Sequence, residues 1–194
     1  SNDIPAINDI DIDGGLDVLA FGQRATIEWH EGLTPNGLGI AENTPCWGRC
    51  GEGLNSNDLA LDACQGVQKM EFSEKNTGGA HAGSTVLTLN LNGDTLTDVL
   101  LVDVSFTNLV AACNGGHIDS AYMSSKDTLF PTSIPTNIEY FPAAFYEDVD
   151  FDSIPDLLVA PNLNGSINQG NAWLYQNTGA SNNPVFASLD SSFL

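Results

Sequence analysis

The sequence predicts an all-β protein made of repeated four-stranded antiparallel sheets. Three observations favour this fold class: long apolar stretches with helical periodicity are absent, turn-forming residues such as Asn, Gly, Ser, Thr and Asp are abundant, and one short acidic pattern occurs three times beside apolar runs. With 194 residues, the chain is long enough to bury a core of its own. These features indicate short strands joined by turns.

The acidic pattern reads D/N-x-D/N-x-D-x-x-x-D, and its copies start at Asp9, Asn90 and Asp148. An apolar run that suits a buried strand follows each copy at once, at 18–21, 99–102 and 157–160. Such a repeat in register, with the same sequel each time, indicates that one structural unit is built three times.

The flanking segments complete the unit. Candidate strands precede the acidic copies at 4–10, 85–91 and 143–149, and later strands are expected at 26–32, 109–116 and 172–179, with an outer strand after residue 184 in the third unit. A strand, an acidic loop and three further strands form a four-stranded antiparallel sheet, which is what a β-propeller blade requires.

The wider gap between the first two copies predicts an insertion. We expect blade 1 at 1–32, a cysteine-containing insertion at 33–80, blade 2 at 81–130 and blade 3 at 131–194. Three blades fall short of the four to eight of a closed propeller, so we expect an incomplete ring that further blades of the same or a neighbouring chain complete. The start of the chain without Met likewise indicates a processed or excised piece.

The acidic loops predict calcium sites. Calcium takes six to eight oxygen ligands, and short carboxylate or amide side chains at positions 1, 3 and 5 direct oxygens toward one centre. Position 7 adds a backbone carbonyl and the Asp at position 9 closes the cage. The expected ligands are Asp9, Asp11, Asp13, Gly15 and Asp17 in loop 1; Asn90, Asn92, Asp94, Leu96 and Asp98 in loop 2; and Asp148, Asp150, Asp152, Ile154 and Asp156 in loop 3.

Two features of the loops refine this prediction. Position 6 favours glycine because the chain turns sharply there, so Gly14 suits it while Thr95 and Ser153 predict strain. Loop 2 has two Asn in place of Asp and is expected to bind calcium most weakly. An EF-hand is excluded because position 12 holds Ala20, Leu101 or Val159 instead of an acid, and a strand follows instead of a helix.

The charge balance excludes several partners. With 25 acidic and 5 basic residues, the net charge of −20 repels nucleic acid and anionic membranes. No apolar run is long enough for a membrane helix, so membrane insertion is not expected.

Catalytic and zinc sites are weaker interpretations than structural ones. His30, His81 and His117 have no triad or metal spacing, and the loop carboxylates are better explained as metal ligands than as glycosidase acids. Cys46, Cys50, Cys64 and Cys113 form an even set that indicates disulfides in an oxidising compartment rather than a zinc site, with three pairings open. Trp29 and Trp173 are expected at matching blade positions in the core.

Several further stretches resemble a known family: Cys46-Trp-Gly-Arg49, His81-Ala-Gly-Ser-Thr85, Asn114-Gly-Gly116, Phe141-Pro-Ala-Ala-Phe-Tyr146 and Pro184-Val-Phe186. With the acidic loops, they resemble the FG-GAP/VCBS repeats of integrin-like propellers in proteins that Bacteroidetes-type bacteria export by type IX secretion. The resemblance implies a propeller, calcium in the hairpins and a secreted or cell-surface location.

The resemblance also bears on the cysteines and on modification. Similar proteins share the Cys46 and Cys64 pair and generally lack Cys50 and Cys113, which implies disulfides Cys46–Cys64 and Cys50–Cys113. Ser120 and Thr128 lie in patterns that resemble the O-glycosylation signal of such proteins. Asn164 begins a sequon for N-glycosylation.

Together these inferences predict a non-catalytic, calcium-stabilised extracellular module that serves in adhesion, binding or surface display. Its expected partner is a protein or a polysaccharide. The alternatives are an accessory domain of a secreted polysaccharide-degrading enzyme and a subunit of an extracellular filament or surface layer.

Overall fold

The computed structural model describes residues 3–22, 25–35, 39–53, 56–64, 84–139, 141–162 and 172–194. Within these ranges the chain is all-β. Three four-stranded antiparallel sheets and one two-stranded hairpin contain all the described strands, and the one other regular element is a 3-10 turn, η1, at Trp47–Arg49. This part of the chain contains no helix of the length and hydropathy needed to cross a membrane.

Each four-stranded sheet is a meander, because strands that follow one another in sequence are hydrogen-bonded neighbours. The first sheet contains β1 (Ala6–Asn8), β2 (Asp17–Phe21), β3 (Ile27–Gly32) and β4 (Ile40–Thr44). The second contains β7 (Ser84–Leu89), β8 (Asp98–Asp103), β9 (Leu109–Asn114) and β10 (Met123–Phe130). The third contains β11 (Pro142–Glu147), β12 (Asp156–Pro161), β13 (Trp173–Asn177) and β14 (Phe186–Asp190).

The fourth strand of the first sheet falls inside the range expected as an insertion. Strand β4 lies on the outer edge, and four of its five residues are exposed. An exposed strand carries no alternation of apolar and polar residues, so the usual sequence signal is missing. The rest of the described insertion adds η1 and the hairpin of β5 (Cys50–Glu52) and β6 (Leu59–Leu61), which Ala25 and Thr26 contact through the backbone.

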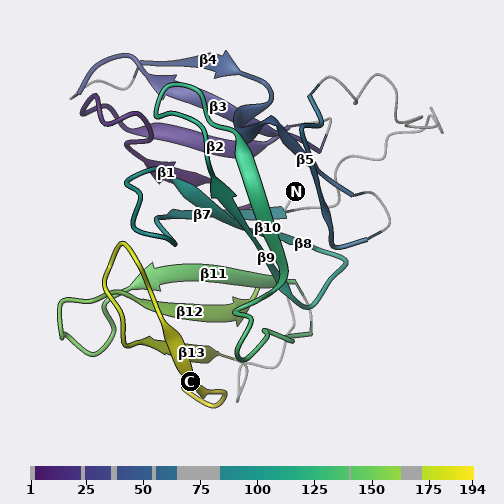
Figure 1. Ribbon diagram of the computed structural model, residues 1–194. Helices are drawn as coiled ribbons and strands as arrows, with labels where there is room; N and C mark the ends of the chain where they lie inside the picture. The colour runs from purple at the N-terminus through teal and green to yellow at the C-terminus, as the bar shows by residue number, and fades with distance from the viewer. Residues whose placement is uncertain are drawn as a thin grey trace.

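The three sheets pack in chain order through two cores (Figure 1). Alternate residues of the middle sheet face opposite ways: Val99 and Leu101 lie in the core shared with the first sheet, and Leu100 and Val102 lie in the core shared with the third. Burial on both faces explains why β8 is a continuous apolar run instead of an alternating one. The first strands lie together, since Ile4 forms a parallel bridge with Thr85 and β11 contacts β7.

Each sheet therefore has two different faces. We call the face that meets the next sheet along the chain the successor face; in the middle sheet it includes Leu100, Val102, Leu109 and Ala111. The opposite, predecessor face of the same sheet includes Val99, Leu101, Val110 and Ala112.

Trp29 and Trp173 both pack in these cores, but they lie on different faces of their sheets. Trp29 pairs with Leu19 and is buried between the first two sheets, while Trp173 pairs with Val159 and packs between the second and third. The expected equivalence of Trp29 and Trp173 is wrong by one residue, and a shift of one residue along a strand exchanges its faces.

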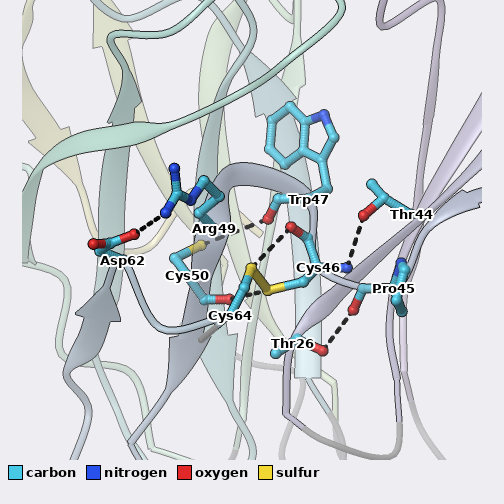
Figure 2. The surroundings of a disulfide bond; sticks show 9 residues. All are labelled: Thr26, Thr44, Pro45, Cys46, Trp47, Arg49, Cys50, Asp62 and Cys64. Carbon is cyan, nitrogen blue, oxygen red and sulfur yellow. Dashed lines mark hydrogen bonds and ion pairs between the residues drawn. A yellow bond between two sulfur atoms is a disulfide. The ribbon is translucent and has the colours of Figure 1, made fainter. Parts of the chain in front are cut away.

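The Cys46–Cys64 disulfide is present, as the resemblance implied. Figure 2 shows it beside η1, where the Arg49 guanidinium pairs with Asp62 and the Thr26 hydroxyl donates to the Pro45 carbonyl at 2.8 Å. The bond ties the segment after β4 to the end of the β5–β6 hairpin.

The expected Cys50–Cys113 disulfide is wrong, since both thiols are free. Cys50 is fully buried in the core between the first and second sheets, with Sγ 3.9 Å from the Trp47 carbonyl oxygen (Figure 2). Cys113 follows Ala112 of that same core on β9, so its side chain leaves the opposite face of the sheet. The middle sheet thus separates the two sulfur atoms.

Replacing both Cys46 and Cys64 with serine should lower the free energy of unfolding by about 3 kcal/mol. A bond between residues 18 apart removes loop-closure entropy from the unfolded chain, and a loop of that length predicts about this loss. Denaturant unfolding measures it, with Cys113→Ser, which removes only a free thiol, as the control. Equal stability of the double variant and the control would contradict the structural role of the bond.

Candidate metal centre

The three acidic loops occupy the same place in the three sheets. Residues 9–17, 90–98 and 148–156 connect the first strand of each sheet to its second strand, and all three hairpins lie on one side of the molecule (Figure 1). The sequence repeat is therefore a repeat in space.

The aspartate at position 9 joins each hairpin to the third strand of its sheet. Asp17 is fully buried; its Oδ2 accepts the N–H of Ile10 at 2.9 Å and its Oδ1 accepts the N–H of Gly32 at 2.8 Å. Asp98 repeats both bonds, with Leu91 at 2.7 Å and Asn114 at 2.7 Å. Burial raises the pKa of Asp98, although these two N–H groups act in the opposite direction.

The side chains at positions 1, 3 and 5 turn inward in loops 1 and 3. In loop 1, Asp9 accepts the N–H groups of Asp13 and Gly14 at 3.1 and 3.0 Å, and loop 3 repeats this arrangement with Asp148, Asp152 and Ser153. As a result, carboxylate oxygens gather within 4.8 Å of one another. The described groups of this kind are Asp9, Asp11 and Asp17; Asp11, Asp13 and Glu31; and Asp148, Asp150 and Asp152.

The anchoring aspartate of loop 3 is held less tightly than those of loops 1 and 2. Asp156 is 2% exposed, and its Oδ1 accepts the N–H of Asn177 at 2.8 Å. Its Oδ2 has no partner within full hydrogen-bond geometry, although the N–H of Val149, the counterpart of Ile10 and Leu91, lowers the pKa of the carboxyl. Burial raises the pKa of Asp156, and the charges of Asp150 and Asp152 raise it further. A bound cation would offset the repulsion among the gathered carboxylates of Asp148, Asp150 and Asp152.

Loop 2 differs in the way its oxygens are used. Asn90 accepts the N–H groups of Asn92 and Gly93 instead of those at positions 5 and 6, and the amide of Asn92 donates to Asp94 at 2.8 Å. In loop 2, a side-chain amide N–H therefore already satisfies the carboxylate of Asp94. The equivalent carboxylates of loops 1 and 3, Asp13 and Asp152, lie beside other acidic side chains instead. None of the clusters above includes loop 2.

Two positions in each loop have left-handed backbone. At position 6, φ is +90° at Gly14, +71° at Thr95 and +73° at Ser153, so the strain predicted at the last two is present. Position 4 is also left-handed, at Ile12, Gly93 and Phe151, which sequence reasoning missed. The one available signal was the glycine at 93. Ile12 and Phe151 hold this conformation with side chains 66% and 89% exposed.

The residues expected to offer a carbonyl at position 7 take part in the turn through their N–H groups. Gly15, Leu96 and Ile154 donate to the carboxylate at position 5, at 2.6, 2.9 and 2.8 Å. This bond fixes the residue whose carbonyl is the expected ligand.

The other candidate residues are scattered. His30 lies on β3 with its Nε2 3.4 Å from Glu28, and His117 is exposed in the turn between β9 and β10. Ser120 is exposed in the same turn, whereas Thr128 is half-buried within β10. His81 and Asn164 lie outside the described residues.

A small cavity beside the β5–β6 hairpin is also lined by acidic residues. Its volume is about 10 Å³, near the smallest that holds one water, and Glu52, Asp58 and Asp103 contribute to its lining. Burial raises the pKa of the Glu52 carboxyl to about 8; the Ser84 hydroxyl lowers it, and Asp103 and Asp3 raise it. The cavity is too small for an organic ligand.

Comparison with models of known protein families and with curated proteins finds no match. The assignment of function therefore depends on the geometry of the hairpins.

Replacing Asp98 with asparagine should lower the free energy of unfolding by about 1–3 kcal/mol in the presence of chelator. One of its two oxygens becomes an amide N–H that faces a backbone N–H, so a buried donor loses its acceptor. The exposed Asp94→Asn is the matched control and should change stability little. Equal losses in the two variants, measured by denaturant unfolding, would contradict the anchoring role.

Stability should fall as the pH rises from about 4.5 to about 8 because of Glu52. The folded protein binds this proton more tightly than the unfolded chain, so the contribution is greatest below the unfolded pKa of 4.5 and is lost above about 8. Glu52→Gln should remove this part of the pH dependence. Calorimetric melting at pH 5 and pH 8.5 measures the difference between the variant and the wild type, and parallel pH profiles would refute the assignment.

Proposed function

We propose that the chain is a calcium-stabilised segment of an extracellular β-propeller that presents its loops to a protein or polysaccharide partner without catalysing a reaction. The observation that carries this proposal is the repetition of one acidic hairpin at the same place in three successive sheets. A single acidic turn forms easily without a metal, but three hairpins in register, two of them with converging carboxylate oxygens, favour a common cation.

The arrangement of the sheets supports the propeller. Each sheet is a meander, the first strands of neighbouring sheets lie together, and successor and predecessor faces alternate along the chain. These are the relations among consecutive blades around a shared axis.

The outer face of the third sheet supports the presence of a further sheet. Leu100, Val102 and Ala111 are at most 4% exposed on the successor face of the middle sheet. In the third sheet, the residues at the same distances from Asp156 and Asn177 are Leu158, Ala160 and Leu174, which are only partly buried. Apolar residues at positions that elsewhere contact the next sheet fit a propeller that continues.

Calcium would act structurally in this proposal. The carboxylate oxygens that gather in loops 1 and 3 are hard donors, which suit calcium. Asp9, Asp11, Asp13 and Asp17 would hold the ion in loop 1, and Asp148, Asp150, Asp152 and Asp156 would hold it in loop 3. A bound cation neutralises clustered carboxylates and fixes each hairpin against the third strand.

The hydrogen bonds of the carboxylates support a structural role rather than a catalytic one. Asp17 and Asp98 each accept one backbone N–H from their hairpin and one from the third strand. Asp9 and Asp148, at position 1 of loops 1 and 3, accept N–H groups of their own turns. Groups held in this way are positioned to build a cage.

A second function, as a subunit of an extracellular assembly, is favoured by one observation. Phe145 is 39% exposed beside Leu158 and Leu174 on the outer face of the third sheet. An apolar sheet face of this kind offers a contact for another subunit.

Calcium at 10 mM should raise the melting temperature relative to excess chelator. For a dissociation constant of about 1 mM, typical of weak extracellular sites, mass action adds about 1.4 kcal/mol of stability for each occupied site. Native mass spectrometry counts the ions, and two or three are expected. Identical melting in calcium and in chelator, with no bound ion, would disprove the proposal.

A further inference from the structure

Two of the acidic hairpins present a bulky apolar side chain to solvent at their tips. Ile12, at position 4 of loop 1, is 66% exposed, and Phe151, at position 4 of loop 3, is 89% exposed. Both have left-handed backbone, with φ of +61° and +65°, which β-branched and aromatic residues rarely adopt. Because both side chains face solvent, packing within the described chain does not explain these residue types.

Loop 2 provides a contrast at the same position. Gly93 has the same left-handed backbone, with φ of +80°, but it lies against the turn between β13 and β14. A Cβ atom at position 93 would lie 3.7 Å from the Cβ of Asn183. The tip that another part of the chain covers therefore has no side chain, whereas the two tips that face solvent have large apolar ones.

More exposed apolar side chains surround the tip of loop 1. Leu16 in the hairpin is 64% exposed, and Leu33 and Ile40 are 60% and 52% exposed. Ile40 pairs with Gly32 across β3 and β4, and Leu33 follows Gly32 directly. A Cβ atom on Gly32 would lie 2.5 Å from the Leu16 carbonyl oxygen, so loop 1 runs against the end of β3. We call Ile12, Leu16, Leu33 and Ile40 the apolar tip.

The surroundings of the apolar tip are acidic. Carboxylate oxygens of Asp11, Asp13 and Glu31 gather within 4.8 Å of one another beside it. In the part of the chain that the structure describes, the Lys and Arg side chains are Arg49 and Lys126. Both pair with aspartates that flank β6, in the β5–β6 hairpin away from loop 1 (Figure 1). The apolar tip therefore combines apolar area with uncompensated negative charge.

We propose that the apolar tip binds a protein segment that presents lysine or arginine beside apolar side chains. This inference rests on the proposed function, in which the loops contact a partner, and it names the partner as a protein. The partner's apolar groups would cover the leucine and isoleucine side chains, and the carboxylates would attract and orient its cations. Aliphatic side chains form no hydrogen bonds, so polysaccharide hydroxyl groups buried against them would remain unsatisfied.

Calcium in loop 1 leaves this attraction in place. The four carboxylates of loop 1 and that of Glu31 contribute five negative charges, and one calcium ion offsets two of them. A net negative charge therefore remains beside the apolar tip, and a cationic partner binds in calcium as well as in chelator.

The first test uses the whole chain and a fluorescent synthetic peptide that alternates leucine with lysine. Fluorescence anisotropy compares the wild type with the double variant Leu16→Ser/Leu33→Ser. The matched control is Leu129→Ser/Leu194→Ser, which removes two leucines that are 56% and 70% exposed elsewhere. The apolar-tip variant should weaken peptide binding about tenfold, and the control should change it less than twofold. Melting in chelator checks that both variants are folded.

The outcomes test both parts of the inference. Equal binding by the two double variants would mean that overall negative charge alone attracts the peptide, and it would overturn the inference. A peptide with glutamate in place of each lysine should not bind, and high sodium chloride should weaken binding of the lysine peptide. Equal affinity for the two peptides would also overturn it. Loss of binding to a glycan panel in Leu16→Ser/Leu33→Ser, with unchanged peptide binding, would identify a polysaccharide partner instead.

Ile12→Asn provides a second test, because a role in binding and a role in stability predict opposite effects. Asparagine adopts left-handed backbone more readily than isoleucine, so the variant should melt at a higher temperature in chelator. It should also bind the lysine peptide about threefold more weakly. A variant that binds the peptide as tightly as the wild type would overturn the inference.

Calcium separates this inference from the proposal on which it rests. A chain that melts identically in calcium and in chelator, but binds the peptide through Leu16 and Leu33, would overturn the calcium sites alone. A chain that calcium stabilises, but whose two double variants bind the peptide equally, would overturn this inference alone.

Discussion

The buried aspartate at the end of each hairpin is the interaction on which the rest of the structure depends. In the first two sheets, Asp17 and Asp98 join the start of the hairpin to the end of the third strand through two backbone N–H groups at 2.7–2.9 Å. In the third sheet, Asp156 accepts the N–H of Asn177 at the end of the third strand. This link sets the register of three strands at once. It also fixes the direction in which the remaining acidic side chains of the loop point, so the architecture of the sheet and the shape of the proposed cation site have one common origin.

The second constraint is the difference between the two faces of a sheet. Strand β8 of the middle sheet is buried on both faces, because Val99 and Leu101 lie in one core and Leu100 and Val102 lie in the other. Stability therefore comes from contacts between sheets as much as from contacts within them, as expected for repeat architectures. The outward face of the first sheet differs, since the matching positions include Glu28 and His30, whose side chains lie 3.4 Å apart.

The sequence predicted the features that depend on local pattern. The all-β class, the positions of most strands, the three equivalent hairpins and the strained Thr95 and Ser153 follow from residue types and spacing. Features that depend on tertiary context were missed or wrong. Strand β4 is exposed and shows no alternation of apolar and polar residues. Cys50 and Cys113 lie on opposite faces of the middle sheet, which the spacing of the cysteines does not reveal. Glu31 comes close to loop 1 from the third strand, far from the loop in sequence. The left-handed Ile12 and Phe151 had no signal of their own, because their residue types oppose that conformation.

The unlike faces of the sheets have a consequence for how such a chain can evolve. A tandem duplication that copies one whole unit inserts a sheet whose predecessor and successor faces already match its neighbours, so the core is preserved without compensating mutations. A duplication that cuts within a unit would instead bring two like faces together. Growth and shrinkage of the gene are therefore expected in whole units, with breakpoints in the connections between sheets. The long segment between the first two units shows that such a connection also tolerates added sequence.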